Sequence, residues 1–194
     1  MAAAGRGQAS GVTRVERVAA MTGTDFVVQP CPPGRLDELF RLRASVWLAA
    51  GADPAAFPDG RWQDARDARR QHWIAVANDD IVGGASLSIC ATLADMHQPE
   101  AYHGAGLATA GAVAAPDRLV VRADWRGRYV VQRLLDAQEA AARAAGAVIA
   151  ARQASRMLRP ILLRRGWREH GPAPHDARFP HEQFTVMSLD LTAR

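Results

Sequence analysis

The sequence predicts a domain of the α/β (α+β) class, with a mixed, mostly antiparallel sheet of six to seven strands and about four flanking helices. Three patterns support this. Residues 72–90 read as a β-hairpin, residues 117–151 as strand, turn, helix and strand, and residues 182–191 alternate like a last strand. A hairpin followed by a β-α-β crossover gives a mixed sheet with helices on both faces.

Composition limits the class of protein. The 194 residues are 48% hydrophobic and 23% charged, as in a globular domain, and no apolar run approaches the roughly 20 residues that span a bilayer. The net charge is +4 and every basic side chain is arginine, which suits a phosphate-bearing ligand and does not indicate nucleic-acid binding. Two cysteines without metal-ligand spacing indicate reduced thiols in the cytoplasm.

The N-terminal part contains weak and strong patterns. Residues 1–23 have little apolar pattern and are expected to be a disordered tail, so the predicted domain covers residues 24–194. A short strand is expected over residues 25–29. A helix follows from Leu36 to about Gly51. Residues 62–71 are highly charged and are interpreted as a second, exposed helix whose charges are solvated.

The hairpin has strands at residues 72–77 and 81–90. Gly83 and Gly84 inside its second strand indicate a bulge or a close approach of another backbone or side chain. Residues 91–112 form a long connection, which in a compact domain often makes a wall or lid over a site. Its polar residues with chemical potential are His97, Tyr102 and His103, each of which is also consistent with an ordinary surface position.

The central stretch has a strand at residues 118–122, a turn at 123–128 and a helix from Tyr129 to Gly146. The first amides of a helix lack helical partners, and the helix dipole places partial positive charge there, so this turn is a candidate anion site. Arg126 and Arg128 add full charges beside it. The alternative is a plain crossover with solvated arginines.

The C-terminal part continues with a strand at residues 147–151 and a basic helix at 154–165. Pro160 predicts that this helix is kinked there or starts there. A strand at residues 167–170, a proline-containing loop and the last strand complete the pattern.

Several motifs in this order resemble those of the GCN5-related N-acetyltransferases (GNAT), over about residues 25–192. The segments that carry the resemblance are residues 118–121, 124–128, 134–135 and 145–147, together with 162–171, which is similar to the family's later leucine-glycine-phenylalanine stretch.

The resemblance implies transfer of an acetyl group from acetyl-CoA, as co-substrate, to the amine of a small-molecule or peptide acceptor. It implies no metal, no nucleic acid and no membrane. The acceptor amine would attack directly in a ternary complex. The central strand would pair with pantetheine, and the turn would hold the pyrophosphate. The residues at these positions are Leu119, Val120 and Val121 in the strand, and Arg126, Gly127, Arg128, Tyr129, Val130 and Val131 in the turn.

Three residues depart from the family pattern. Tyr129 and Val131 stand where the family has glycines, which let the backbone approach the pyrophosphate, so weaker cofactor binding is expected. Leu162 stands at the position of the family's frequent tyrosine general acid. The resemblance places the general base at Asp117, while Tyr102 or His103 could supply the acid.

Two alternatives stay open. One is a catalytically degenerate GNAT-fold binding or regulatory protein with weak or no CoA binding. The other is an enzyme similar to the acyl-homoserine-lactone synthases, a comparison that depends on Arg43, Trp47 and the charged segment 61–70. A homodimer is also left open.

Overall fold

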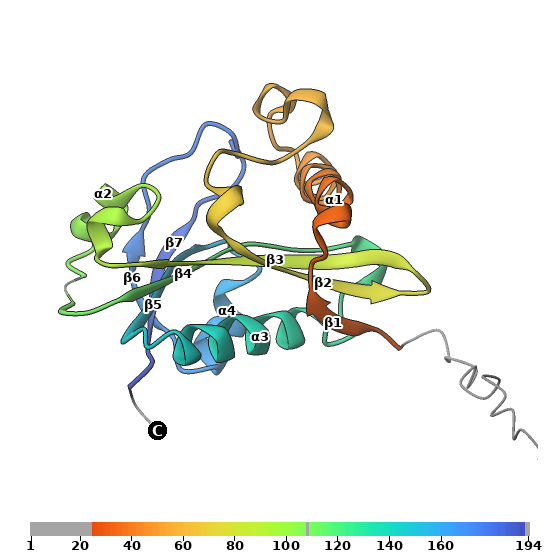
Figure 1. Ribbon diagram of the computed structural model, residues 1–194. Helices are drawn as coiled ribbons and strands as arrows, with labels where there is room; N and C mark the ends of the chain where they lie inside the picture. The colour runs from red at the N-terminus through yellow and green to blue at the C-terminus, as the bar shows by residue number, and fades with distance from the viewer. Residues whose placement is uncertain (1–24, 108, 193–194) are drawn as a thin grey trace, which may run out of the picture.

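The computed structural model describes residues 25–107 and 109–192, and the predicted N-terminal tail lies outside them. Seven strands form one sheet in the order β1-β2-β3-β4-β5-β7-β6, in which only β4 and β5 are parallel (Figure 1). This confirms the predicted mixed, mostly antiparallel sheet. The strands are β1 (Val27–Pro30), β2 (Gln71–Ala77), β3 (Asp80–Cys90), β4 (Val113–Val121), β5 (Ile149–Ala154), β6 (Arg168–Pro172) and β7 (Thr185–Asp190).

Four helices cover the two faces of the sheet (Figure 1). Helices α1 (Leu36–Leu48) and α2 (Pro99–Gly104) lie on one face, and α3 (Val130–Ala144) and α4 (Arg159–Arg164) on the other. The largest apolar cluster joins α3 and α4 to the sheet through fully buried side chains such as Leu134, Leu135 and Leu162. The predicted arrangement of helices on both faces is therefore confirmed.

The hairpin forms at β2 and β3, as predicted. Asn78 and Asp79 make its turn with φ values of 47° and 68°, the left-handed pair that matches the twist of the strands. A Cβ atom on Gly84 would lie 2.3 Å from Cδ1 of Leu39, so α1 packs directly against this glycine. The register between β3 and β4 also shifts between Gly84 and Ser86, which confirms both a bulge and a close approach.

The charged segment before β2 differs from its prediction. Residues 62–71 do not form an exposed helix; they contain only a 3-10 turn at Asp67–Arg69, and both Asp67 and Arg70 are buried. Oδ2 of Asp67 accepts a hydrogen bond from the backbone N–H of Asp64 at 2.8 Å, which holds the chain in a turn. Besides Arg70 in the same segment, its arginine partners come from α1 and β4, which a local charge pattern does not reveal.

The long connection contains α2 and a 3-10 turn at Leu93–Asp95, neither of which was predicted. Met96 and Tyr102 from this connection are buried with Val113 and Ala151 of the sheet, so the segment packs onto β4 and β5.

Two boundaries also changed. Strand β4 begins at Val113, five residues before the predicted strand, in a stretch of alanine and proline with little β-branched character. The predicted helix at 154–165 is shorter, because β5 continues to Ala154, paired with Thr185 of β7, and α4 starts at Arg159 with Pro160 in its first turn.

Candidate functional site

The parallel strands β4 and β5 pair only at one end. Val113 pairs with Ile149 and Ala114 with Ala150, and beyond these pairs the two strands diverge. A cavity of about 470 Å³ lies at this divergence, lined by both strands, by the long connection, by the segment before β2 and by the loop before β7. The divergence of the two strands therefore leaves a concave site in the sheet. Small ligands bind preferentially at concave sites of this kind.

Strand β4 has a free edge at this site. Its other edge is paired with β3, as at Gly84 with Val120 and at Ser86 with Asp117. From Ala115 to Val121, the edge that faces β5 has no strand partner among the described residues. Backbone groups on such an edge can pair with an extended ligand, and the predicted pantetheine-binding residues Leu119, Val120 and Val121 belong to it.

A bulge in β4 orients the next residues. Arg118 has a φ of 52°, an unusual conformation for a residue with a side chain in a strand. Gln138, buried on α3, donates from Nε2 to the carbonyl of Ser86 at 2.6 Å and lies 3.4 Å from the carbonyl of Asp117. Helix α3 therefore stabilises the bulge. The successive β4 residues Asp117, Arg118 and Leu119 at this bulge line the cavity.

An arginine–aspartate network fixes the wall beside this bulge. Arg43 of α1 contacts Asp67 at 3.1 Å, and Arg118 contacts Asp64 at 2.5 Å while lying 4.7 Å from the ring of Trp62. Arg70 reaches Asp67 at 3.3 Å. The whole network joins three arginines and three aspartates: Arg43, Arg70 and Arg118 with Asp64, Asp67 and Asp117.

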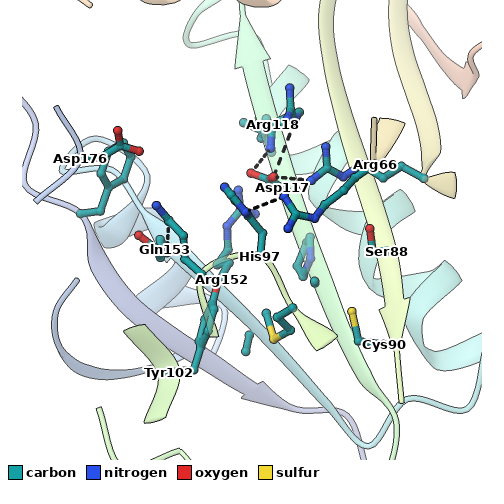
Figure 2. Close-up of a pocket in the computed structure, with 18 of the residues that line it drawn as sticks. Arg66, Ser88, Cys90, His97, Tyr102, Asp117, Arg118, Arg152, Gln153 and Asp176 are labelled. Carbon is teal, nitrogen blue, oxygen red and sulfur yellow. Dashed lines mark hydrogen bonds and ion pairs between the residues drawn. The ribbon is translucent and has the colours of Figure 1, made fainter. Parts of the chain in front are cut away.

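Asp117 lies at the boundary between this network and the cavity (Figure 2). Its side chain is 41% exposed, although it lies deep in the protein, because the exposed part faces the hollow. Burial acts to raise the pKa of Asp117, but the charges of Arg118 and Arg70 outweigh it and hold the pKa below its usual range. Asp117 is thus a fixed negative charge, better suited to holding an ammonium group than to removing its proton.

The structure brings two of the three polar residues of the long connection into the cavity lining, namely His97 and Tyr102. His97 Nδ1 lies 2.9 Å from Nη1 of Arg66, and since arginine can only donate, Nδ1 accepts. Burial, together with the charge of Arg66, lowers the pKa of His97. The neutral ring therefore carries its proton on Nε2.

Tyr102 is buried, and this burial raises its pKa, so the hydroxyl keeps its proton. His103 is exposed on α2 and lies outside the cavity lining.

The predicted anion-binding turn is at the N-terminus of α3. The N–H of Arg133 bonds to the carbonyl of Tyr129 at 3.1 Å, so the amides of Val130, Val131 and Gln132 precede the first helical bond. No side chain caps this end. The helix begins within one residue of its predicted start.

Tyr129 adopts the left-handed conformation that a glycine favours, with a φ of 63°, and its side chain is 72% exposed. Val131 is half-buried and packs against the core, and the exposed residues Arg126, Gly127 and Arg128 precede the helix. Leu162 is fully buried in the core, so the position of the family's tyrosine acid holds an apolar packing residue.

Sequence reasoning missed several lining residues. Trp62, Arg70 and Arg152 line the cavity but were not named as site residues. The three-residue spacing of Asp64, Asp67 and Arg70 was a usable signal, whereas Arg152, in an alanine-rich strand, carried none.

In the described part of the chain, no group of three His, Cys, Asp or Glu side chains is placed to hold a metal, and no helix is long and apolar enough to cross a bilayer.

The fold is similar to that of several solved acyltransferases. The N-acyl amino acid synthase FeeM from uncultured soil microbes is 11% identical, with a TM-score of 0.66 over 87% of this chain and 92% of that chain. The CoA-dependent acyl-homoserine lactone synthase BjaI is 17% identical, with a TM-score of 0.65 over 86% of this chain and 84% of that chain. A GNAT acetyltransferase from Staphylococcus aureus is 15% identical, with a TM-score of 0.59 over 86% and 99%.

No curated protein matches the chain in sequence. Residues 36–158 match the profile of the family described as "Acetyltransferase (GNAT) family", which spans α1, the hairpin, the diverging strands and α3. The matched region is more than half of the chain, and the observed sheet agrees with it. The protein therefore belongs to the GNAT family of acetyltransferases.

Proposed function

We propose that this protein is an acyl-CoA-dependent N-acyltransferase that moves an acyl group, with acetyl the simplest candidate, to an amine in a ternary complex. The observation that carries this proposal is the divergence of β4 and β5, which leaves the β4 edge free beside a cavity. The uncapped N-terminus of α3 follows the same strand. An extended chain with a phosphate at one end and a reactive thioester at the other would fit this arrangement.

Each part of the site then has a role. The backbone of Leu119 to Val121 pairs with the pantetheine arm, and the amides of Val130 and Val131 hold the pyrophosphate. The acceptor enters the cavity, where Asp117 attracts its ammonium group. Catalysis depends chiefly on positioning the amine against the thioester carbon, together with a backbone N–H of β4 that stabilises the developing oxyanion.

Proton transfer needs separate partners. The fixed charge of Asp117 makes it a weak base, so the ammonium proton would leave through water in the cavity. Tyr102, with a raised pKa, is better placed to donate a hydrogen bond than to protonate the departing thiolate. The Nε2–H of His97 is the second donor on this wall.

A second candidate is a reaction like that of the acyl-homoserine lactone synthases. It is favoured by the buried network that joins Arg43, Asp64 and Asp67, since the sequence resemblance to those enzymes depended on Arg43, Trp47 and residues 61–70. Trp47 also lines the cavity. The similarity in fold to BjaI supports the same candidate. Both candidates use an acyl-CoA donor and an amine acceptor.

Isothermal titration calorimetry with acetyl-CoA and with longer acyl-CoAs tests the donor directly. Micromolar binding supports an enzyme, and an acyl-length preference separates the two candidates. No binding at millimolar concentration would contradict the transferase proposal and favour the degenerate GNAT-fold protein. Release of free CoA thiol in the presence of amines then measures turnover.

Two further expectations accompany the proposal. Cys31 and Cys90 are both free, in agreement with a reducing cytoplasm. A homodimer stays a prediction, for which sedimentation velocity at several protein concentrations is the appropriate measurement.

A further inference from the structure

Arg152 is a buried cation without a partner. It extends from β5 into the lining of the cavity and is only 4% exposed. Its Nε and Nη1 atoms are buried and have no hydrogen-bond partner among the residues that the structure describes. Figure 2 shows its side chain running from β5 toward Asp117, whose charge acts on it.

The neighbouring acidic groups already have arginine partners. Arg70 and Arg118 approach Asp117 at 3.4 and 3.7 Å, whereas no carboxylate of the described chain lies within 4.0 Å of Arg152. Asp176, on the opposite wall, is paired with Arg178 at 2.6 Å. The network of three arginines and three aspartates balances its own charge, so Arg152 adds an uncompensated positive charge to the cavity.

Such a charge is costly in the absence of a ligand. An ionised group that leaves water without a partner destabilises the folded state, and replacing it by an apolar side chain is often neutral or stabilising. Burial lowers the pKa of Arg152 to about 10, which still leaves it charged at neutral pH. A purely structural arginine would be expected to have a carboxylate or carbonyl acceptor, as Arg43 has in Asp67.

A guanidinium group is a preferred partner of a carboxylate, because its N–H groups donate charge-assisted hydrogen bonds. In Arg152 the Nη2 group lies outside the buried, unpaired set and is the one that would contact the ligand. We propose that Arg152 is the carboxylate receptor of the acceptor site, and that the acceptor is an amino acid whose free carboxylate lies next to the reacting amine. Asp117 then faces the ammonium group of the same molecule. This inference rests on the proposed N-acyltransferase function.

The rest of the cavity agrees with a molecule of this kind. Asp117 on β4 and Arg152 on β5 come from the two diverging strands, and each carries the charge that complements one end of a zwitterion. Aromatic side chains of Trp47, Trp62 and Phe179 line another part of the cavity, where an apolar side chain of the acceptor would pack.

The decisive experiment compares acceptors that differ only in the carboxylate. L-Leucine is compared with L-leucinamide and 3-methylbutylamine, and L-phenylalanine with phenethylamine, by measuring kcat/KM for thiol release from the acyl-CoA that binds best. The wild type is expected to prefer the free amino acids by roughly 10- to 100-fold, the value of one charge-assisted hydrogen-bonded pair. In Arg152→Met this preference should disappear, while the affinity for acyl-CoA is unchanged.

The control variant is Arg164→Met, which removes an exposed arginine from α4, outside the cavity lining, and should retain the wild-type preference. Equal kcat/KM for amino acids and amines in the wild type would overturn the inference. An equal loss of kcat/KM for all acceptors in Arg152→Met would also overturn the inference, because that result would place Arg152 at the thioester. Weaker acyl-CoA binding by Arg152→Met would assign its charge to the cofactor.

A measurement without turnover separates this inference from the proposed function. Thermal unfolding is measured in L-leucine in the 10 mM range, roughly 100 times the dissociation constant. The bound amino acid should raise the Tm of the wild type by several degrees but not that of Arg152→Met. Without ligand, Arg152→Met should unfold at the same temperature or higher. A large fall in Tm, or failure to fold, in both Arg152→Met and Arg152→Lys would show a structural role and overturn the inference.

If acyl-CoA does not bind at all, the proposed function fails, whatever the amino acid does to the Tm. If acyl-CoA binds and uncharged amines are acylated as well as amino acids, only the assignment of Arg152 fails.

Discussion

The two edges of β4 differ in how completely they are paired. Along β3 the pairing runs from Cys90 opposite Val113 to Gly83 opposite Val121, with one bulge, and α1 packs closely over it. Along β5 it stops after two residue pairs, and the cavity begins where it stops. One edge therefore supplies rigidity and the other supplies unpaired backbone groups, so a rigid strand presents an open edge to a ligand.

The same contrast holds for the charges on each side. Beside the paired edge, Arg43 and Arg118 both form ion pairs with Asp67 in a buried network. At the open edge, Arg152 has no carboxylate within 4.0 Å in the described chain. Variants on the first side should change stability, and variants on the second side should change activity or ligand binding.

The largest effect is expected from Asp67→Ala, which removes a shared acceptor of Arg43, Arg70 and Arg118. Leaving buried cations without their partner should reduce the free energy of unfolding by about 3–5 kcal/mol. Urea denaturation at pH 7 measures it. A loss of unfolding free energy below about 1 kcal/mol would mean that the network contributes little to stability beside the paired edge of β4.

The pH dependence of that stability has a defined sign. Burial acts to raise the pKa of Asp67, but Arg118 and Arg43 lower it overall. Because the folded pKa is below the unfolded value of 3.8, the contribution is present above that pH and is lost as pH falls through the folded pKa. The wild type should therefore lose more stability between pH 5 and about pH 2 than Asp67→Ala does, as urea titrations at each pH would record.

Gly84→Ala tests the packing of α1 on the paired edge. The added Cβ would come within 2.3 Å of Cδ1 of Leu39, which must move in a fully buried position. Overpacking of this kind costs about 1–3 kcal/mol. The matched control is Gly34→Ala, where nothing lies within 4 Å of the new atom. Equal unfolding midpoints for the two variants would contradict the proposed close contact.

Asp117→Asn tests the charge at the open edge. The amide keeps the shape of the side chain but removes the charge that attracts an ammonium group, so kcat/KM for the amine should fall by roughly 10- to 100-fold. The dissociation constant for acyl-CoA should stay unchanged in calorimetry. An unchanged kcat/KM would remove Asp117 from the acceptor site and leave the entry of the amine to other groups.

Tyr129→Gly is expected to have the smallest effect on stability. Releasing a residue with a side chain from a φ of 63° removes a strain of about 1 kcal/mol, although a more flexible unfolded chain offsets part of it. The same change brings the loop to the family pattern and should tighten acyl-CoA binding several-fold. Val131→Gly should also tighten binding, with some loss of stability because Val131 packs against the core. Weaker binding in both folded variants would show that this turn does not hold the pyrophosphate.

Much of the scaffold could be predicted because its signals are local. The hairpin turn at Asn78 and Asp79, the close approach at Gly84 and the start of α3 beside Tyr129 all follow from short patterns of backbone preference and apolar spacing. The residues proposed for the site lie at different places in the fold. Asp117 and Tyr102 were singled out and do line the cavity, whereas His103 was singled out and is exposed on α2.

The error in the charged segment before β2 has a clear physical cause. Residues 62–71 were interpreted as a solvated helix, but their aspartates Asp64 and Asp67 are paired with Arg118 and Arg43, which are distant in the sequence. Burying a charged side chain is tolerated only when an oppositely charged group lies within contact distance. The spacing of residues along one segment does not show whether a distant residue supplies that group.

Local sequence patterns were enough to predict the order of the strands, the mixed sheet and the start of α3, because hydrophobic period, turn residues and proline positions act over a few residues. The folded structure was needed to show that β4 and β5 diverge after two pairs, that Asp67 and Arg70 are buried, and that two nitrogens of Arg152 lack a hydrogen-bond partner in the described chain. Those features depend on contacts between residues that are distant in the sequence. The free-energy cost of burying a charge or leaving a strand edge unpaired is set by the groups that surround it in the folded protein.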